Sequence, residues 1–557
     1  MNKLEIRCLN NNTMRDYAPG ITLKEICDDM QIRLASPVIA ALVNNELKEL
    51  SHEVYNPKQI RFIDLSHPDG MRTYVRSLSF LLQVALKETF PQHKLRVQHS
   101  VSNGIYCEIT DGTRTVDIDE IVAIEKRMNE LVKADLPFIK KKLATSEAIE
   151  LFRAEGYVEK ALLHETKGKM YTSVYWLDGH ADSFYGPLAH STGALRRFGL
   201  SSYFQGVLLM LPEPNDGEKL RPYILQNKLL QVFHEHKERN EILEAESLGS
   251  LNMAIREGRL AKLIHINEAL HEKNFAHIAD RIADNRRIRI ALIAGPSSSG
   301  KTTSAKRLEI QLRASKLNPH IIELDNYFVD REDTPRDEYG EYDFESLQAV
   351  DLNLFNSQMR ALLDGKNVRL PKFDFTLGKR FFPPNNSMQL STDDVLIIEG
   401  IHGLNPALIT MVDDESVLRI YASALTSISL DENNRIPTTD NRLIRRIVRD
   451  AATRSYAAVD TIARWPSVRR GEDVNIFPFQ ENADIMFNSF LLYELCVLKR
   501  YAVPLLRSVP AGRPEYAEAL RLLKFISYFE ALDEEHERII PPNSVLREFI
   551  GGSSFVY

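Results

Sequence analysis

Continuous apolar runs alternate with helical patterns in the second half of the chain. RIRIALIA (287–294) and DDVLIIEG (393–400) are typical of strands buried on both faces of a parallel sheet. HIIELDNYF (320–328) predicts a third strand that runs into a loop, and TTSAKRLEIQLRAS (302–315) has the period of a helix. The order predicts an α/β domain, a parallel sheet with helices on both faces, at residues 286–510.

The first half follows a different pattern. Short strand candidates surround one helix in residues 1–65, where Thr22 is the expected N-cap and Asn44-Asn45 the expected turn. Residues 66–230 predict an α+β domain, with an amphipathic helix at 76–91 and helices separated by a break at Pro137. Helical patterns then predict a helical linker at 231–285 and a C-terminal helical tail at 511–557. The histidines of the linker fit a solvated surface better than a metal cluster; they are His234, His236, His265, His271 and His277.

Composition narrows the class of protein. The 557 residues carry a formal net charge of −7, so no overall basic field favours nucleic acid. The four cysteines form no CxxC pair, which argues against a zinc ribbon or a disulfide framework. We find neither an N-terminal apolar signal nor a run of about 20 apolar residues that could span a bilayer. We therefore expect a cytoplasmic, multidomain protein without a membrane partner.

GPSSSGKT (295–302) matches the phosphate-binding pattern GxxxxGK[ST]. Glycines let the loop wrap closely, so that backbone N–H groups can point at phosphate oxygens. Lys301 would contact the β- and γ-phosphates, and the helix that follows would add its positive N-terminal end. The sequence therefore predicts a site for ATP or GTP. Its candidate residues are Gly295, Ser297, Ser298, Ser299, Gly300, Lys301, Thr302 and Thr303.

Two acidic residues follow buried strands near this loop. Glu399 ends the strand at 393–400 and, with the Thr302 hydroxyl, is the expected Mg²⁺ ligand. Asp325 stands at the C-terminal end of another strand, where ligands of open α/β sheets bind, and can accept a proton from an attacking hydroxyl. Asp325, Lys301 and Glu399 are therefore the candidate catalytic residues.

Together these motifs resemble the uridine kinase and phosphoribulokinase family over residues 287–505. LDNYF, YDF (342–344), LPKFDF (370–375), VLIIEG and RLIRRIVRDAATR (442–454) occur in the family's order. The resemblance implies Asp325 as catalytic base, Tyr327 as an aromatic near the substrate and Asp343 as the acid that holds ribose hydroxyls. It implies Arg446, Arg449 and Arg454 as lid arginines that contact substrate and triphosphate. The alternative is a solvated basic helix, because Arg442 and Arg445 of the same helix fit surface charge equally well.

The departures from the family concern the acceptor. Where the family has a tyrosine that reads the base, this chain has Phe373. The histidine that acts with it is replaced by Gly378, and a glutamine of the lid is replaced by Arg464. A nucleoside, with transfer to its 5′-hydroxyl, remains the favoured acceptor. Arg464, Arg469 and Arg470 suggest an anionic metabolite as the alternative, as in phosphoribulokinases. Phe373 and Arg464 stay among the candidate substrate-binding residues.

The first half resembles the TGS domain, a β-grasp module (1–65), and the editing domain of threonyl-tRNA synthetases (66–230). The editing site of that family rests on histidines and a cysteine, and the matching positions here are Arg76, Phe80, Phe184 and Leu188. None of these side chains can replace a metal-binding histidine, so we expect no editing activity. A nucleotide-gated regulator that contacts RNA or tRNA is the third hypothesis. Homo-oligomerisation is left open.

Overall fold

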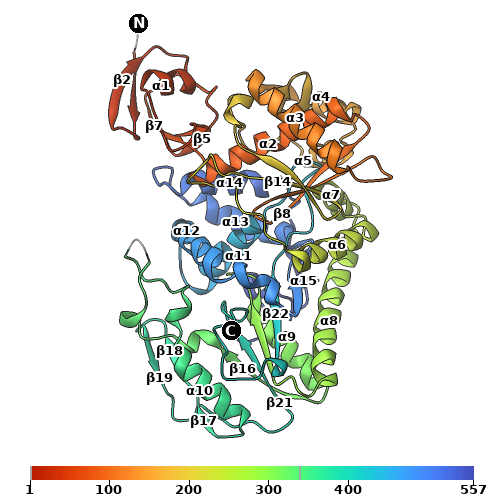
Figure 1. Cartoon of the computed structure of the whole chain (residues 1–557), viewed down its shortest axis with the longest axis vertical. Coiled ribbons are helices and arrows are strands. Elements are labelled where there is room, and N and C mark those ends of the chain that lie inside the picture. The colour runs from red at the N-terminus through yellow and green to blue at the C-terminus, as the bar shows by residue number, and fades with distance from the viewer. Residues whose placement is uncertain (1–2, 338–339) are drawn as a thin grey trace.

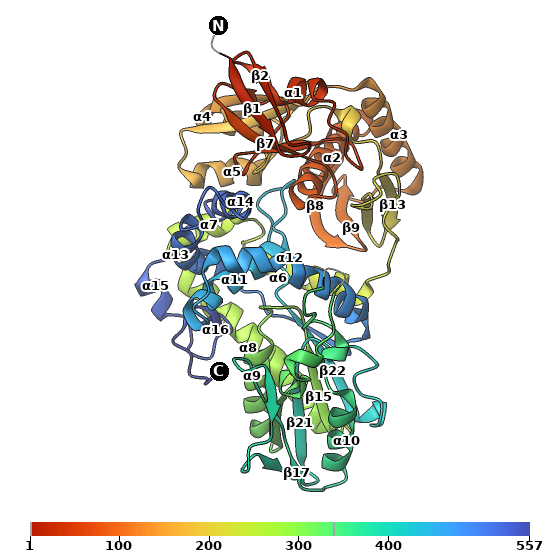
Figure 2. The same cartoon turned by 90° about the vertical axis from the view of Figure 1, so that its left-hand side faces the viewer.

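The computed structural model describes residues 3–337 and 340–557 and stacks them in three tiers. The N-terminal half forms the top of Figure 1, a group of helices the middle, and a parallel sheet the bottom. Figure 2 shows the same order from the side, with α8 (Leu260–Asp284) running from the middle tier down to the sheet. No helix of the described residues is long and apolar enough to cross a membrane.

The N-terminal unit is a twisted sheet that covers one helix. Thr22 is the N-cap of α1 (Leu23–Asp29), as predicted, and it also forms a capping box with Glu25. Asn44 and Asn45 have φ of 48° and 62° and form the predicted turn of a hairpin. The sheet has the order β2-β1-β7-β4-β5. Its strands are β1 (Leu4–Cys8), β2 (Thr13–Tyr17), β4 (Ala40–Val43), β5 (Glu46–Lys48) and β7 (Lys58–Ile63), and a small ribbon pairs β3 (Ile21–Thr22) with β6 (Glu53–Val54).

The second unit packs helices on two antiparallel sheets. Its helices are α2 (Pro68–Thr89), α3 (Ile118–Ala134), α4 (Thr145–Ala154) and α5 (Val158–Lys167). One sheet contains β10 (Ile139–Ala144), β11 (Tyr171–Leu177) and β12 (His180–Asp182). The other has the order β13-β14-β9-β8, formed by β8 (Lys94–Val101), β9 (Gly104–Thr110), β13 (Gly199–Tyr203) and β14 (Gly206–Met210).

The four positions that replace the editing residues lie in the core of this unit. The rings of Phe80 and Phe184 are 5.5 Å apart, and Leu188 is fully buried with them. The Arg76 guanidinium donates to the Pro187 carbonyl at 3.1 Å. The described ranges contain no group of three or more His, Cys, Asp or Glu side chains that could hold a metal ion. The absence of editing activity stays a prediction.

The middle tier joins the linker helices to the C-terminal helices in one apolar core. Leu251 of α7, Leu443 of α11, Leu495 of α13 and Leu522 of α14 belong to it. The linker helices are α6 (Asn227–Ile242), α7 (Leu248–Arg256) and α8. The later helices are α11 (Thr438–Thr453), α12 (Ala458–Asn475), α13 (Glu494–Arg507), α14 (Tyr516–Ile526), α15 (Glu534–Arg538) and α16 (Arg547–Ile550).

The bottom tier confirms the predicted parallel sheet. Its order is β16-β21-β15-β22-β23, and every pairing is parallel. Along β15, Ile290 and Leu292 face the core of α10, whereas Ala291 and Ile293 face that of α8 and α9, so helices cover both faces. The elements are β15 (Ile290–Ala294), β16 (Asn318–Glu323), β21 (Asp394–Glu399), β22 (Val417–Ser423), β23 (Ile485–Asn488), α9 (Lys301–Ala314) and α10 (Leu352–Leu363). Short ribbons pair β17 (Val368–Arg369) with β20 (Ser387–Met388), and β18 (Lys372–Asp374) with β19 (Lys379–Phe381).

Candidate active site

The phosphate loop joins the central strand β15 to α9. A Cβ at Gly295 would overlap the Ala422 carbonyl of the neighbouring strand, so the close turn requires glycine. Gly300 has φ +84° and precedes the helix directly. The Ser304 N–H bonds back to the Gly300 carbonyl at 2.9 Å, and the N–H groups before it have no partner within the helix. The loop therefore presents the donors and positive helix end that bind phosphate.

The two predicted Mg²⁺ ligands lie side by side. The Thr302 hydroxyl donates to Glu399 Oε1 at 2.9 Å, because β21 runs beside β15 with Glu399 opposite Ile293. Burial raises the pKa of Glu399 to about 7; the Lys301 ammonium opposes this shift and the Asp325 carboxylate adds to it. A hydroxyl and a carboxylate are oxygen donors of the kind that Mg²⁺ takes. The pair therefore fits a divalent cation bound with the triphosphate.

Asp325 reaches the same cleft from the far side of β21. It lies in the 3-10 turn Leu324–Tyr327 that follows β16. Enclosure in the cleft raises the pKa of its carboxyl, whereas Lys301 lowers it. Lys301 Nζ is 3.4 Å from the Pro296 carbonyl, within the loop itself. A carboxylate, an ammonium and the cation ligands thus surround the place where a γ-phosphate would lie.

Tyr327 differs from its predicted place near the substrate. Its ring is 1% exposed, packs on Phe355 with centroids 5.1 Å apart, and its hydroxyl donates to Gln358. The strand β16 ends in a helical turn whose side chains point in different directions. Those of Leu324 and Tyr327 are buried in the core, whereas that of Asp325 is exposed in the cleft. Tyr327 therefore supports the turn that carries Asp325.

Glu345 was missed by the sequence reasoning. Asp343, the predicted ribose-binding acid, accepts the backbone N–H of Glu345 at 3.1 Å through Oδ1. Burial raises the pKa of Glu345 to about 7, Glu472 adds to this shift, and Arg446 and Lys301 oppose it. Glu345, two residues after Asp343, therefore shares the electrostatic environment of the phosphate loop. A second acid in the segment YDFES was the signal for it.

Phe373 lies next to the loop that carries Asp325. Its backbone N–H donates to Asn326 Oδ1 at 3.2 Å, and its ring packs on Phe328 and Phe375 with centroids 5.8 and 5.2 Å away. Phe375 is 59% exposed. Gly378, with φ +68°, closes the β18–β19 hairpin, and a Cβ there would overlap Arg331. An aromatic surface therefore stands beside Asp325 where the family has hydrogen-bonding groups.

Three predicted lid arginines gather around one carboxylate. Asp450 accepts from Arg446 at 3.3 Å and from Arg449 at 2.9 Å, and it lies 3.7 Å from Arg454. Arg446 also donates to the Ser297 hydroxyl of the phosphate loop at 2.8 Å. Three cations share one anion here, which leaves positive charge beside the loop.

Arg442 and Arg445 are not the surface charge expected. They are 1% and 0% exposed and donate to the carbonyls of Ser297 and Ser298. Buried carboxylates neutralise them: Glu472 of α12 pairs with Arg442, and Glu494 of α13 with Arg445. The inward face of α11 packs on α12, α13 and the phosphate loop. Arg442 and Arg445 therefore stabilise the loop through its backbone carbonyls. Glu472 also accepts the Ser297 N–H at 2.9 Å.

The remaining basic residues of α12 make contacts within the chain. Arg464 is exposed and lies over the Tyr456 ring at 4.8 Å. Arg469 pairs with Glu472 at 2.8 Å, and Arg470 lies 3.8 Å from Asp337. These contacts weaken the reason for expecting an anionic acceptor.

The C-terminal residues cover one side of the phosphate-binding helix. The Thr303 hydroxyl is buried, donates to Glu548 at 2.6 Å and lies 2.9 Å from the Tyr557 hydroxyl. The Thr303 side chain, predicted to bind ATP, is thus engaged by the chain itself, and its backbone N–H remains the candidate contact. This partner lies 245 residues away in the sequence.

The loop that precedes α11 inserts into the second, editing-like unit. We name residues 431–435 the docking loop. Asn433 Nδ2 donates to Gln83 at 3.0 Å and to Asp182 at 2.8 Å, and Asn434 donates to the Ser183 carbonyl. The fully buried Lys160 pairs with Asp182 below this contact. The loop leads directly into α11, so the N-terminal half positions the helix of the lid arginines.

The parallel sheet, the phosphate loop and the Thr302–Glu399 pair are the features of a P-loop nucleotide-binding domain. The sequence profile of the Phosphoribulokinase / Uridine kinase family matches residues 290–492, about a third of the chain, so this region of the chain is similar to that family. Two solved structures are similar in part. A chain provisionally described as a fructose transport system kinase from Silicibacter sp. TM1040 has 17% identity and a TM-score of 0.27, with 38% of this chain and 98% of that one covered. A chain provisionally described as a uridine kinase from Bacillus stearothermophilus has 19% identity and a TM-score of 0.25, with 36% and 89% covered.

The N-terminal region matches threonine–tRNA ligases. The ligase of Syntrophomonas wolfei is 27% identical over 190 residues, which are 34% of this chain and 30% of the ligase. That of Marinobacter nauticus is 29% identical over 203 residues, 36% of this chain and 32% of the ligase. The chain therefore spans about a third of the length of these curated relatives.

Proposed function

We propose that the protein transfers the γ-phosphoryl group of ATP to the 5′-hydroxyl of uridine or a related nucleoside. The observation that carries the proposal is the pair of acceptor-side carboxylates, Asp325 and Glu345, each of which senses the charge of Lys301. A neutral acceptor with several hydroxyl groups suits carboxylates that accept hydrogen bonds. An anionic acceptor would be repelled by the Asp325 carboxylate, and by Glu345 in its ionised form.

Each residue of the proposed site has a separate role in an in-line transfer of the phosphoryl group. Asp325 accepts the proton of the attacking hydroxyl as the new O–P bond forms and the bond between the γ-phosphorus and the bridging oxygen of ADP breaks. Lys301 and Arg446 stabilise charge on the transferred group. Thr302 and Glu399 would hold Mg²⁺, which supplies charge neutralisation on the β- and γ-phosphates. Glu345 would accept hydrogen bonds from ribose hydroxyls and orient the nucleoside.

The base would rest on Phe373 and Phe375. Both rings stand beside the Asp325 turn, and an aromatic surface binds a base by stacking rather than by hydrogen bonds. The proposed enzyme would therefore discriminate weakly between pyrimidines, because the hydrogen-bonding side chains that the family uses to read the base are replaced by Phe373 and Gly378.

The test is ADP release with Mg-ATP against a panel of nucleosides and sugar phosphates. We expect uridine or cytidine to drive turnover in the wild type, and Asp325→Asn to reduce kcat at least a hundredfold while ATP still binds. Turnover with a sugar phosphate alone would replace this proposal with the anionic alternative. ADP release that depends on no acceptor would contradict both.

A further inference from the structure

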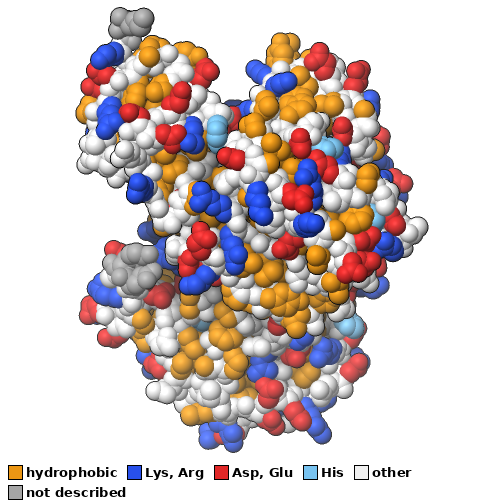
Figure 3. Space-filling model, turned by 45° about the horizontal axis from the view of Figure 1, so that its top comes forward, with side chains coloured by type: hydrophobic (Ala, Val, Ile, Leu, Met, Phe, Trp, Pro, Cys, Tyr) orange, Lys and Arg blue, Asp and Glu red, His pale blue; other side chains and the backbone are white. Residues whose placement is uncertain are grey.

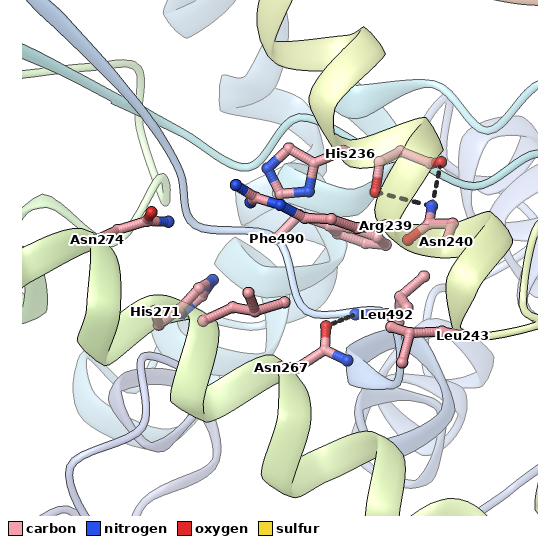
Figure 4. Close-up of a pocket in the computed structure, with 11 residues that line it drawn as sticks. His236, Arg239, Asn240, Leu243, Asn267, His271, Asn274, Phe490 and Leu492 are labelled. Carbon is pink, nitrogen blue, oxygen red and sulfur yellow. Dashed lines mark hydrogen bonds between the residues drawn. The ribbon is translucent and has the colours of Figure 1, made fainter.

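The hollow between the linker helices α6 and α8 is too small for a ligand (Figure 4). Its volume is about 20 Å³, which is room for about one water molecule. Asn240 donates to the Ser427 carbonyl at 2.7 Å, and Asn267 accepts the Leu492 N–H at 3.3 Å. His271 borders the hollow, is 3% exposed and packs on Phe487, so the expectation of a solvated surface is wrong for this histidine. The hollow therefore belongs to the packing of the middle tier.

The last turns of α12 contact both sides of the candidate active site. Gly471 and Glu472 are consecutive residues of this helix, and both are buried. Glu472 contacts Ser297 of the phosphate loop, and Gly471 faces Glu345, the acid proposed to hold the acceptor. Two neighbouring residues of one helix thus meet the nucleotide side and the acceptor side.

Ser297 is held through each of its polar groups. Its N–H donates to Glu472 Oε1 at 2.9 Å, its carbonyl accepts from Arg442 at 3.1 Å, and its hydroxyl accepts from Arg446 at 2.8 Å. Glu472 accepts in turn from Arg442 and from Arg469, each at 2.8 Å. Burial raises the pKa of Glu472, but these two guanidinium groups outweigh it and keep the pKa below its usual value. A buried, charged carboxylate therefore anchors the first serine of the loop.

Gly471 leaves room for the side chain of Glu345. A Cβ at Gly471 would lie 2.4 Å from the Cβ of Glu345 and 2.6 Å from its Cγ. These atoms stand next to the backbone and cannot swing aside as the end of a side chain can. From the other direction, Asp343 Oδ1 accepts the Glu345 N–H at 3.1 Å. Glu345 is therefore held between its own segment and α12.

The charge of Glu472 also reaches Glu345. Burial raises the pKa of Glu345 to about 7, and the carboxylates of Glu472 and Asp325 add to this shift. Arg446 and Lys301 oppose it. These groups belong to α12, to the turn after β16, to α11 and to α9. Glu472 thus acts on Glu345 through charge, in addition to the contact made by the neighbouring glycine.

We propose that Gly471 and Glu472 form a positioning element that sets the phosphate loop and the acceptor acid against each other. Glu472 fixes Ser297, and Gly471 fixes Glu345. In-line transfer requires the attacking oxygen and the γ-phosphorus to approach within about 3–3.5 Å, so a constant separation of the two sides favours the reaction. The inference rests on the proposed function, because it takes Glu345 as the residue that holds the acceptor.

Glu472→Gln tests the role of the charge. Ser297 loses part of its anchor, so kcat should fall at least about tenfold. The rising limb of kcat/KM for the acceptor should also move to lower pH by about half a unit or more, because a negative charge that raises the pKa of Glu345 is gone. Asp473→Asn is the matched control and should change neither quantity. Asp473 is the next residue, is 59% exposed and pairs with Arg469 at 3.1 Å.

Gly471→Ala tests the contact while it keeps the buried ion pairs of Glu472. The added methyl group overlaps Glu345, so the KM for the acceptor should rise about tenfold, whereas the Kd for a non-hydrolysable ATP analogue should stay within about twofold. An unchanged KM for the acceptor would overturn the inference. This variant also decides the matter if Glu472→Gln does not fold.

A double variant isolates the effect on Glu345. In a Glu345→Gln chain the remaining limb belongs to Glu399 and Asp325, and Glu472→Gln should leave it in place. An equal shift in both backgrounds, or no shift in either, would overturn the inference.

A readout without turnover separates this inference from the proposed function. Absence of turnover with every acceptor, in the wild type and in Asp473→Asn alike, would contradict the proposed function only. Carbon-13 NMR of the chain labelled at its glutamate carboxyl groups then follows Glu345 directly, with Glu345→Gln to assign the signal. We expect a lower pKa of Glu345 in Glu472→Gln than in the wild type, and equal values would overturn the positioning element.

Discussion

Two carboxyl groups in the cleft, those of Glu345 and Glu399, change their protonation state near neutral pH. Glu345 and Glu399 both have a pKa raised to about 7 by burial, although Lys301 lowers each of them. A carboxyl with a raised pKa in the folded chain is protonated at mildly acidic pH, where a free carboxyl would be ionised. The cleft therefore gains negative charge, and with it hydrogen-bond acceptors, as the pH rises through 7.

For Glu345 this predicts a pH-dependent acceptor affinity. The value of kcat/KM for the nucleoside should rise between about pH 6 and pH 8, because the ionised carboxylate accepts the ribose hydroxyls. Glu345→Gln should lower kcat/KM by about tenfold to a hundredfold and flatten this limb, leaving the parts that belong to Glu399 and Asp325. Glu341→Gln, an exposed neighbour, is the control. An unchanged pH profile in Glu345→Gln would contradict the role.

Arg445 gives a second prediction at this scale, one of stability. Arg445→Leu should lower the free energy of unfolding of the lower half by about 3–5 kcal/mol, because it leaves Glu494 buried without its partner. Arg500→Leu removes a surface pair with Glu534 and should cost less than about 1 kcal/mol. Guanidinium denaturation followed by circular dichroism compares the two. Equal shifts would show that burial of the pair contributes nothing.

At the scale of elements, α16 matters because it ends against α9. Glu548 places a negative charge beside the N-terminal turn of the helix that binds the triphosphate, and Thr303 holds it there. The phosphate loop is therefore enclosed by α11 and α12 on one side and by the C-terminal residues on another. Each of these elements bonds to a different part of the same loop or its helix.

Removing this charge should strengthen ATP binding. Glu548→Gln keeps the shape of the side chain, and loss of one negative charge near the triphosphate should lower the Kd for ATP about fivefold, the effect of roughly 1 kcal/mol. Titration calorimetry at low salt measures it, and the difference should shrink at high salt. Glu535→Gln in α15 is the control. A weaker affinity in Glu548→Gln would indicate that the contact supports the loop instead.

The sequence predicted those site residues whose position depends on the neighbouring residues in the chain. The phosphate loop, Glu399 and Asp325 each stand at the end of an apolar run, so the strand pattern alone placed them at one edge of the sheet. Arg445 and Arg446 are adjacent in the sequence, yet one is buried and the other faces the cleft. Whether each arginine is buried depends on its contact partners, Glu494 for Arg445 and Ser297 for Arg446, which lie far away in the sequence. A local sequence pattern does not show such partners. Glu345, Glu472 and Glu548 were missed for the same reason.

At the scale of the whole molecule, the docking loop joins the two halves into one mechanical unit. The buried contacts of Asn433 with Gln83 and Asp182 fix the segment that leads into the arginine helix. On the face seen in Figure 3, acidic and basic side chains are interspersed. We therefore interpret the N-terminal half as a support for the kinase lid.

This interpretation predicts energetic coupling between the halves. In a double-mutant cycle, Gln83→Ala and Asn433→Ala should show a coupling energy of about 0.5–1.5 kcal/mol in thermal or denaturant unfolding. Both single variants should also raise the KM for ATP, because the lid arginines lose their anchor. Gln83→Ala with Arg500→Ala serves as the additive reference pair. Additivity in the first cycle would mean that the halves fold and act independently.

The docking loop also has a consequence for synthesis. Gln83 and Asn433 are 350 residues apart, so the cleft that receives the loop is made long before the loop itself. At about 5–20 residues per second, a ribosome needs roughly 20–70 s to cover this distance. During that time Lys160 and Asp182 lack the covering asparagines, and water or a chaperone must take their place. Slow codons between the two halves would lengthen this exposed interval, and a chain released early would carry an open, aggregation-prone cleft.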